Sequence, residues 1–227
     1  SGMTLRTDCC APVGEVQLGF VGRVLLNAFN QIEYGEKNGQ GDLVRQGQAI
    51  FDSYLEHGFT QNGYLRDFVN FDREGLDAVE VHSIRQQSEA VYAILHYLKY
   101  EKSQGRKHKS WETKTRALLD NLIKLQKTDG HFARKFNDDG TDVDASGGST
   151  PSATSTLVMG YRYFGNKNYL KSAKRTVDYV ERNIIAPADY FSSTLDANCE
   201  DKEAAIAAVT STYYLAMVTK GKERQHY

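Results

Sequence analysis

The hydrophobic pattern divides most of the chain into helical segments of two alternating kinds. Segments of the first kind are apolar over most of their circumference: residues 19–30, 84–100, 152–164 and 204–218. Segments of the second kind have one apolar and one charged face: residues 43–57, 111–127 and 169–183. A helix that is apolar all round is buried on every side, whereas a striped helix faces solvent on one side. The pattern therefore predicts an inner row of helices that alternates with outer helices.

Signals at the segment ends support helices rather than strands. Thr150 and Pro151 precede the segment 152–164 as an N-cap and a first-turn proline. No stretch shows the alternation of a strand with turn pairs, and the strand-like runs 63–71 and 131–136 fall between helices. We therefore expect an all-α fold of about seven helices, built from helical hairpin repeats.

Three long connections repeat along the chain, each of them after an outer segment. They open at residues 63, 130 and 189, a spacing of roughly sixty residues. Each begins with an aromatic residue and has an aspartate a few positions later: Asp72, Asp138 and Asp196. The connections from inner to outer segments are shorter, so the long loops should gather at one end of the molecule, where long ordered loops are often functional.

Two short motifs carry a resemblance to a known fold. Residues 126–132 (QKTDGHF) form a Gln-x-x-Asp-Gly-x-aromatic turn after an outer segment, and residues 165–170 (GNKNYL) lead into the next one. These motifs resemble the (α/α) toroids of the six-hairpin glycosidase type, a superfamily whose turns also occur in polysaccharide lyases, sugar epimerases and terpenoid cyclases. The resemblance covers most of residues 19–218 and implies an (α/α) toroid or partial toroid. It matches no single family's catalytic signature.

The length of the chain departs from a complete ring. A closed ring of six hairpins needs roughly 350 residues with ordinary helix and loop lengths, and this chain has 227. It is an open partial ring, a fragment of a longer enzyme with further domains, or a smaller toroid. We expect residues 1–18 to be an N-terminal arm or tag remnant and 19–227 to be the toroid domain. The cellular location would be periplasmic or extracellular if a native signal peptide preceded Met3.

Composition narrows the classes of partner. Lys and Arg number 28 and Asp and Glu 29, so the net charge is −1, without the basic excess of a generic nucleic-acid binder. No apolar run approaches the ~18 residues of a membrane helix. Three cysteines without a CxxC motif argue against a disulfide framework or a zinc ribbon. We expect neither a nucleic acid nor a membrane as a partner.

Carboxyl groups in the long loops are the candidates for catalysis. Glycoside hydrolysis commonly uses two of them, one protonated and one ionised, and close carboxylates push their pKa values apart. Asp196 and Glu200, just before the last inner segment, are the preferred acid and base, with Asp72, Glu80 and Asp138 in reserve. Capping and helix-dipole roles compete with this interpretation, because acidic residues also favour helix N-termini.

Aromatic and imidazole side chains in the same loops are candidates for sugar binding. Flat rings stack on sugars, although they also anchor loops to helices. The candidates are Tyr64, His82, His131, Phe132, Tyr190 and Phe191. Clustered oxygens in the loop from Asp138 to Asp144 suit Ca²⁺, but the spacing fails the EF-hand pattern, so a solvated turn is favoured and no cofactor is expected.

These features together favour a carbohydrate-active protein. The first hypothesis is a glycoside hydrolase-like module that acts on an oligo- or polysaccharide with paired carboxylates. The second is a polysaccharide lyase or sugar epimerase of the same fold, with His82 or His131 and a tyrosine as acid and base. The third is a non-catalytic helical module that binds glycan or packs between domains. A terpenoid cyclase is disfavoured because DxDD and DDxxD clusters are absent from the sequence.

Overall fold

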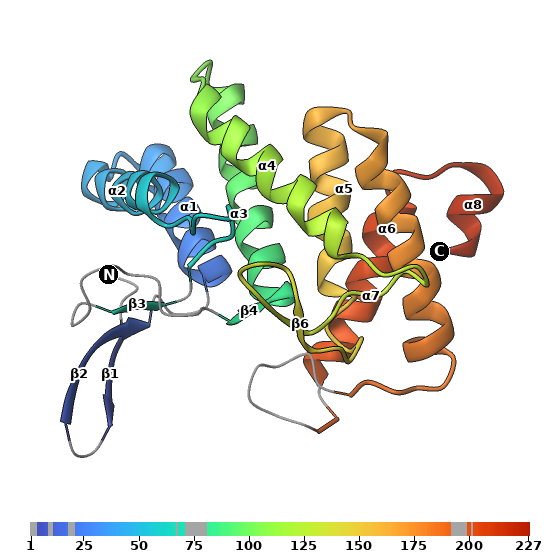
Figure 1. Ribbon diagram of the computed structural model, residues 1–227. Coiled ribbons are helices and arrows are strands. Elements are labelled where there is room, and N and C mark those ends of the chain that lie inside the picture. The colour runs from blue at the N-terminus through green and yellow to red at the C-terminus, as the bar shows by residue number, and fades with distance from the viewer. Residues whose placement is uncertain are drawn as a thin grey trace.

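The computed structural model describes residues 4–8, 11–17, 21–66, 68–70, 81–191, 199–200 and 202–227. In this part of the chain, two layers of helices lie side by side (Figure 1). The inner row consists of α1 (Val21–Asn38), α3 (Ile84–Ser103), α5 (Ser152–Phe164) and α7 (Lys202–Ala216). The outer layer consists of α2 (Gly41–His57), α4 (Lys109–Leu125) and α6 (Lys167–Val180). A π-helical turn (Glu181–Ile185) extends α6, and a short helix, α8 (Gly221–His226), ends the chain.

The helix contacts follow the predicted alternation. Along the inner row α1 packs on α3, α3 on α5 and α5 on α7, while α2 packs on α1, α4 on α3 and α5, and α6 on α5 and α7. A continuous core fills the space between the layers, with Phe51 of α2 stacked on Tyr97 of α3 at a ring-centre distance of 4.1 Å. This arrangement confirms the prediction of an all-α, toroid-like fold with inner and outer helices. No helix among the described residues is long and apolar enough to cross a membrane.

The described parts of the long connections lie at one end of the molecule, as expected (Figure 1). They lead into the N-terminal ends of α3, α5 and α7, whereas the opposite end has short connections such as Gly165–Asn166. That connection explains the second sequence motif. Gly165 ends α5 with a left-handed φ of 70°, and the Asn166 side chain caps α6 by accepting a hydrogen bond from the Asn168 N–H at 3.0 Å.

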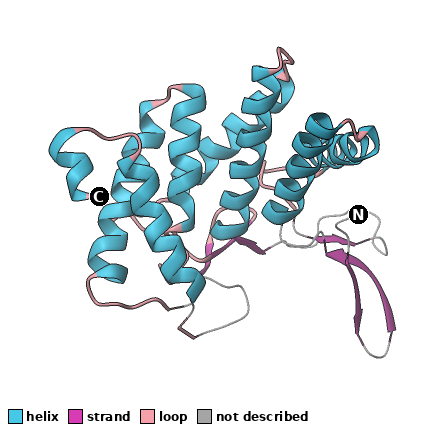
Figure 2. Cartoon of the chain, turned by 180° about the vertical axis from the view of Figure 1, so that it is seen from behind, coloured by secondary structure: helices cyan, strands magenta, loops and turns pink. Residues whose placement is uncertain are grey.

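Short strands lie in the N-terminal segment and in the long loops (Figure 2), two of them within or overlapping the strand-like runs 63–71 and 131–136. A hairpin of β1 (Thr4–Asp8) and β2 (Ala11–Gln17) pairs with β3 (Phe68–Asn70), and β4 (Val81–Ser83) pairs with β5 (Lys135–Asn137), which pairs with β6 (Asp142–Asp144). All of these pairings are antiparallel. Strands of three residues are too short for their alternation to stand out in a sequence. The second sheet ties the first long loop to the second.

Helix α7 is less buried than its charge-free sequence predicted. Ile206, Val209, Tyr213 and Met217 follow one another along one face and are 62, 68, 61 and 46% exposed. The opposite face packs on α5 and α6. The prediction of burial on every side was wrong for this helix, because α7 is the last member of the inner row in the described part of the chain and has an inner neighbour on one side.

Candidate functional site

A pocket of about 330 Å³ lies where the N-terminal ends of the four inner helices meet. The inner helices deliver side chains to it from their first three turns, because they start at the same end of the molecule. Its polar lining consists of Arg23 from α1, Arg85 and Glu89 from α3, Ser152 and Ser155 from α5, and Glu203 and Thr210 from α7. Residues up to 187 positions apart in sequence (23 and 210) therefore share one site.

The guanidinium of Arg85 joins two carboxylates at the centre of this pocket. Its Nε donates to Oε1 of Glu89 at 2.9 Å, and its Nη2 donates to Oε2 of Glu203 at 2.6 Å. Arg23 lies 3.6 Å from the other carboxylate oxygen of Glu203. The Arg85 side chain is 13% exposed, and those of Glu89 and Glu203 are 32 and 38% exposed, so both carboxylates face solvent in the pocket. Burial lowers the pKa of Arg85, but the two carboxylates outweigh it and the pKa is raised.

A second pocket of about 330 Å³ continues along the inner face. It shares Arg23, Glu89, Ser155 and Thr210 with the first, so the two form one groove, which we call the inner groove. Tyr92 of α3 and Tyr214 of α7 line this part, and their hydroxyls are hydrogen-bonded at 2.6 Å. Burial, followed by this hydrogen bond, raises the pKa of Tyr214. The groove thus offers carboxylates, guanidinium groups, hydroxyls and phenol rings along one surface.

One close helix contact shapes the groove. A Cβ atom added to Gly22 of α1 would lie 2.2 Å from Cβ of Glu89 and 2.6 Å from its carbonyl carbon. Glycine at this position lets the backbones of α1 and α3 approach each other beside the pocket. The approach sets the position of Glu89 relative to Arg23, the next residue of α1.

The loop candidates Tyr64, His82 and Asp138 form a separate cluster. The imidazole of His82 is fully buried, and its Nε2 lies 2.8 Å from Oδ1 of Asp138. Asn62 donates to the other oxygen of that carboxylate at 2.9 Å. The His82 ring packs against Tyr64 and Phe136 at ring-centre distances of 5.2 and 5.5 Å, and those two rings contact each other at 5.1 Å. The structure therefore brings together candidates from the first and second long loops and buries the imidazole among them.

The electrostatics of this cluster favour a neutral histidine and an ionised aspartate. Burial lowers the pKa of His82 against the opposing effect of Asp138. Burial raises the pKa of Asp138, but hydrogen bonds from Thr60, His82 and Asn62 outweigh it, and the net pKa is below its usual value. Burial and the neighbouring aspartates raise the pKa of Tyr64 to about 12. The His82–Asp138 pair joins the first long loop to the second, next to the pairing of β4 with β5.

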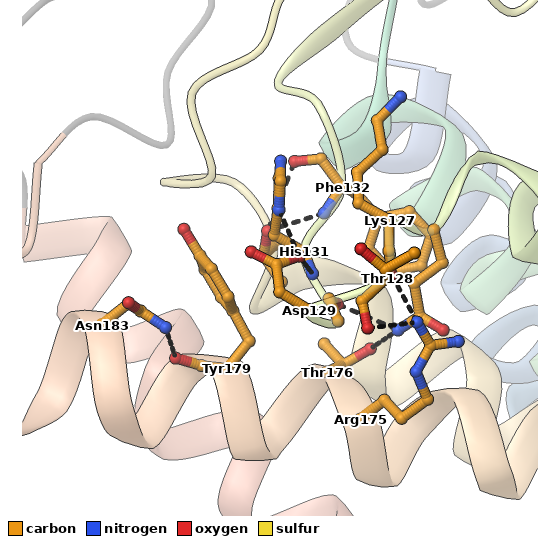
Figure 3. Close-up of polar contacts among 12 residues, drawn as sticks. Lys127, Thr128, Asp129, His131, Phe132, Arg175, Thr176, Tyr179 and Asn183 are labelled. Carbon is orange, nitrogen blue, oxygen red and sulfur yellow. Dashed lines mark hydrogen bonds and ion pairs between the residues drawn. The ribbon is translucent and has the colours of Figure 1, made fainter.

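The Gln-x-x-Asp-Gly-His turn holds α4 against α6 (Figure 3). The Gln126 amide nitrogen lies 2.9 Å from the carbonyl oxygen of Gly130 and 3.1 Å from that of Ser172 on α6. Arg175 donates to the carbonyl oxygens of Lys127 and Thr128. Nδ1 of His131 lies 2.6 Å from Oδ1 of Asp129. The motif on which the resemblance rests thus fastens the turn after α4 to the next outer helix, α6.

The remaining sequence candidates lie apart from the inner groove or outside the described residues. Phe132 is buried in the core, Tyr190 packs beside Val180 and Ile184, and exposed Phe191 forms an antiparallel bridge with exposed Glu200. Asp72, Glu80 and Asp196 lie outside the described residues. The catalytic roles expected for these acids remain predictions.

The loop considered for Ca²⁺ has its carboxylates in other interactions. Asp142 pairs with Lys127 at 2.8 Å, Asp144 lies 3.5 Å from Arg134, and Asp139 accepts from Thr141. In the described part of the chain, no three His, Cys, Asp or Glu side chains converge in a way that could hold a metal ion. The solvated turn favoured for this loop, and calcium as its alternative, both stay predictions.

Sequence reasoning missed Arg23, Arg85 and Glu89 as site residues. The signal was present: Arg85, Glu89 and Tyr92 are spaced by four and three positions in a segment that is otherwise largely buried. Polar residues at this spacing on an inner helix share one face. In a ring of helices the polar face of an inner helix lines the centre, so the charges of Arg85 and Glu89 indicated where the groove lies.

No family model matches this sequence, and no curated protein matches it. Its fold is similar to that of an unsaturated glucuronyl hydrolase from Bacillus sp. GL1, with a TM-score of 0.66 and 13% identity over 91% of this chain and 58% of that one. It is also similar to a cellobiose 2-epimerase from Spirochaeta thermophila, with a TM-score of 0.62 and 14% identity over 94% and 56%. A third similar structure is a sugar epimerase from a ruminal bacterium, with a TM-score of 0.62 and 15% identity over 92% of this chain and 57% of that one. The chain thus shares the helical toroid fold of these structures over the part it matches, and it spans somewhat more than half of their length.

Proposed function

We propose that this is a carbohydrate-active protein that binds a saccharide in the inner groove. The observation that carries the proposal is the convergence of Arg85, Glu89 and Glu203 with serine, threonine and tyrosine side chains in one pocket. Ligand sites combine a concave shape with a few convergent polar groups. The structural neighbours named as sugar-acting enzymes share the fold in which this groove is formed, which supports the choice of ligand.

Each group in the groove suits a polyhydroxylated ligand. The carboxylates of Glu89 and Glu203 accept hydrogen bonds from sugar hydroxyls, and such charge-assisted bonds are about twice as strong as neutral ones. Ser155 and Thr210 can donate or accept. The rings of Tyr92 and Tyr214 offer apolar surface to the C–H groups of a sugar. Arg85 keeps the two carboxylates in fixed positions before the ligand arrives.

Hydrolysis is a second candidate, because Glu89 and Glu203 place two carboxyl groups in one groove. A glycosidase needs one of its carboxyls protonated at the moment of bond cleavage. In the described arrangement both carboxylates accept a hydrogen bond from the guanidinium of Arg85. Hydrolysis at this site would therefore require one glutamate to leave Arg85 when the sugar binds. The loop acids Asp196, Glu200, Asp72, Glu80 and Asp138 remain alternative catalytic groups.

A binding screen followed by an activity assay tests the proposal. We expect ligand-observed NMR to detect binding of at least one member of a panel of oligosaccharides. Glu203→Gln should weaken that binding by on the order of tenfold, because a charged hydrogen-bond acceptor is lost. Glu56→Gln, an exposed site on α2, is the matched control. The proposal is wrong if no saccharide binds, or if the control and the groove variant behave alike.

Release of reducing ends separates hydrolysis from binding alone. Turnover by the wild type that Glu89→Gln and Glu203→Gln both abolish would support the carboxyl pair as the catalytic groups. Turnover that survives both substitutions would move catalysis to the loop acids. Binding without turnover would favour the non-catalytic module.

A further inference from the structure

The charges that line the inner groove compensate one another. Among its described lining residues the ionised side chains are Arg23 and Arg85 on one side and Glu89 and Glu203 on the other. Each cation lies within ion-pair distance of a carboxylate: Arg85 with both glutamates and Arg23 with Glu203. The described lining side chains therefore carry no net charge.

We propose that the groove selects an uncharged saccharide over a uronate, and that Glu89 sets this preference by holding the guanidinium of Arg85. The inference rests on the proposed function and adds the class of sugar. A neutral sugar offers hydroxyl protons to the carboxylates and leaves the ion pairs intact. A uronate adds a third carboxylate beside two others.

The cost to a uronate has two parts. Its carboxylate must leave water, which is unfavourable unless the site supplies donors in exchange. The Nε and Nη2 donors of Arg85 are already given to Glu89 and Glu203. The uronate is also repelled by the like charges of those glutamates, and such repulsion is a common means of discrimination between ligands.

The helix N-termini at the groove favour a uronate, because they attract anions, and so they reduce the preference for a neutral sugar. Each N-terminus carries a partial positive charge of about half an elementary charge, which attracts anions within the first turn. Glu203 lies in the first turn of α7, so a carboxylate of the protein already occupies this region, whereas Glu89 lies one turn further along α3. Removal of one carboxylate should therefore expose the positive potential to the ligand.

Matched sugar pairs test the preference. The probes are p-nitrophenyl glucoside with p-nitrophenyl glucuronide, and the galactoside with the galacturonide, whose members differ at C6 alone. The wild type should bind the neutral member of a pair roughly tenfold more tightly at constant ionic strength, and Glu89→Gln should reduce this ratio by on the order of tenfold. Glu33→Gln removes the same charge from an exposed ion pair with Lys37 outside the groove and should leave the ratio unchanged.

The outcomes separate the inference from the proposed function. Wild-type binding of the uronide as tightly as the neutral sugar would overturn the inference and leave the saccharide site in place. An unchanged ratio in Glu89→Gln would overturn the role of Glu89, and binding of neither member in any pair would contradict the proposed function and the inference together. Glu203→Gln makes the same charge change at the other end of Arg85 and replaces Glu89→Gln if that variant does not fold.

Discussion

Arg85 and Glu203, 118 positions apart in the sequence, meet at 2.6 Å between Nη2 and Oε2. This pair connects the first turn of α3 to the first turn of α7, two inner helices with α5 between them. The same guanidinium also donates to Glu89 through Nε, so the planar fork of Arg85 binds two carboxylates from two helices. The pair thus closes the inner face of the helix row at the end where the long loops lie.

We expect Arg85→Lys to disrupt this connection although the charge is kept. An ammonium group is a point charge and cannot reproduce the planar fork that serves two carboxylates. The free energy of unfolding should fall by about 1 kcal/mol, the range of partly exposed ion pairs, and saccharide binding should weaken. Urea denaturation measures the first effect and ligand-observed NMR the second. Arg45→Lys, at an exposed pair on α2, is the control, and an equal loss in both variants would contradict the expectation.

Gly22→Ala should destabilise the fold beside the groove. The new Cβ would lie 2.2 Å from Cβ of Glu89 and 2.8 Å from the backbone nitrogen of Ala90, so α1 and α3 must separate. Overpacking of this kind costs about 1–3 kcal/mol, which denaturant titration would show. At Gly41 an added Cβ would meet only the flexible end of Arg45 at 3.3 Å. Gly41→Ala should therefore be tolerated, and equal losses at the two glycines would contradict this account.

Glu101 gives part of the stability a defined pH dependence. Burial raises the pKa of Glu101, but hydrogen bonds from Arg106 and His108 outweigh it, and the net pKa lies below the ordinary value of 4.5. A depressed folded-state pKa means that the contribution is fully present above about pH 4.5 and is lost as the pH falls through the folded-state value. Unfolding free energies measured from pH 6 down to about pH 3 should therefore decline.

Glu101→Gln isolates that contribution. The carboxylate is 2% exposed and bonds Arg106 at 2.5 and 2.9 Å and His108 at 2.8 Å. The variant should lose about 2–4 kcal/mol near neutral pH and show a shallower decline on acidification. Glu56→Gln should keep the wild-type slope. A wild-type slope in Glu101→Gln would assign the acid sensitivity to other carboxylates.

We expect polar replacements on the exposed face of α7 to reduce self-association of the protein without disturbing its folding. Ile206, Val209 and Tyr213 are each more than 60% exposed, so polar replacements there remove few core contacts. Val209→Lys should change the unfolding free energy by no more than about 0.5 kcal/mol, as at other surface positions. It should also reduce any concentration-dependent association seen in analytical ultracentrifugation. Leu215→Lys, on the buried face of the same helix, should in contrast prevent stable folding.

The alternation of inner and outer helices could be predicted because burial leaves a periodic mark on the sequence. A helix such as α5, with buried Ala153, Leu157 and Val158, carries no charge until Arg162. The position of the long loops followed from the lengths of the connections. The strand-like run 131–136 overlaps β5, but the pairing of β4 to β6 could not be predicted in this way, because three residues define no period and the pairing joins loops that are distant in sequence.

The groove was less accessible to sequence reasoning for a physical reason. Acids that follow one another in a loop, such as Asp196 and Glu200, are visible as a cluster in the sequence. Arg85 and Glu89 share one face of α3, whereas Glu203 joins them from α7 only through packing. Glu203 in particular has the position of an ordinary helix-dipole partner, and its bond to Arg85 depends on the distance between α3 and α7. A pairwise contact of this kind has no local signature.

The anchoring of Gln126 changes how similar sequences should be interpreted. Its amide nitrogen reaches Gly130, Ser172 and Thr176, and its amide oxygen accepts from the Ser172 hydroxyl at 2.8 Å. A shorter side chain, or an apolar one, would leave those partners unsatisfied where one hairpin packs on the next. Proteins that share this turn should therefore have in common the way one hairpin is fastened to the next, while the reaction each performs is free to differ.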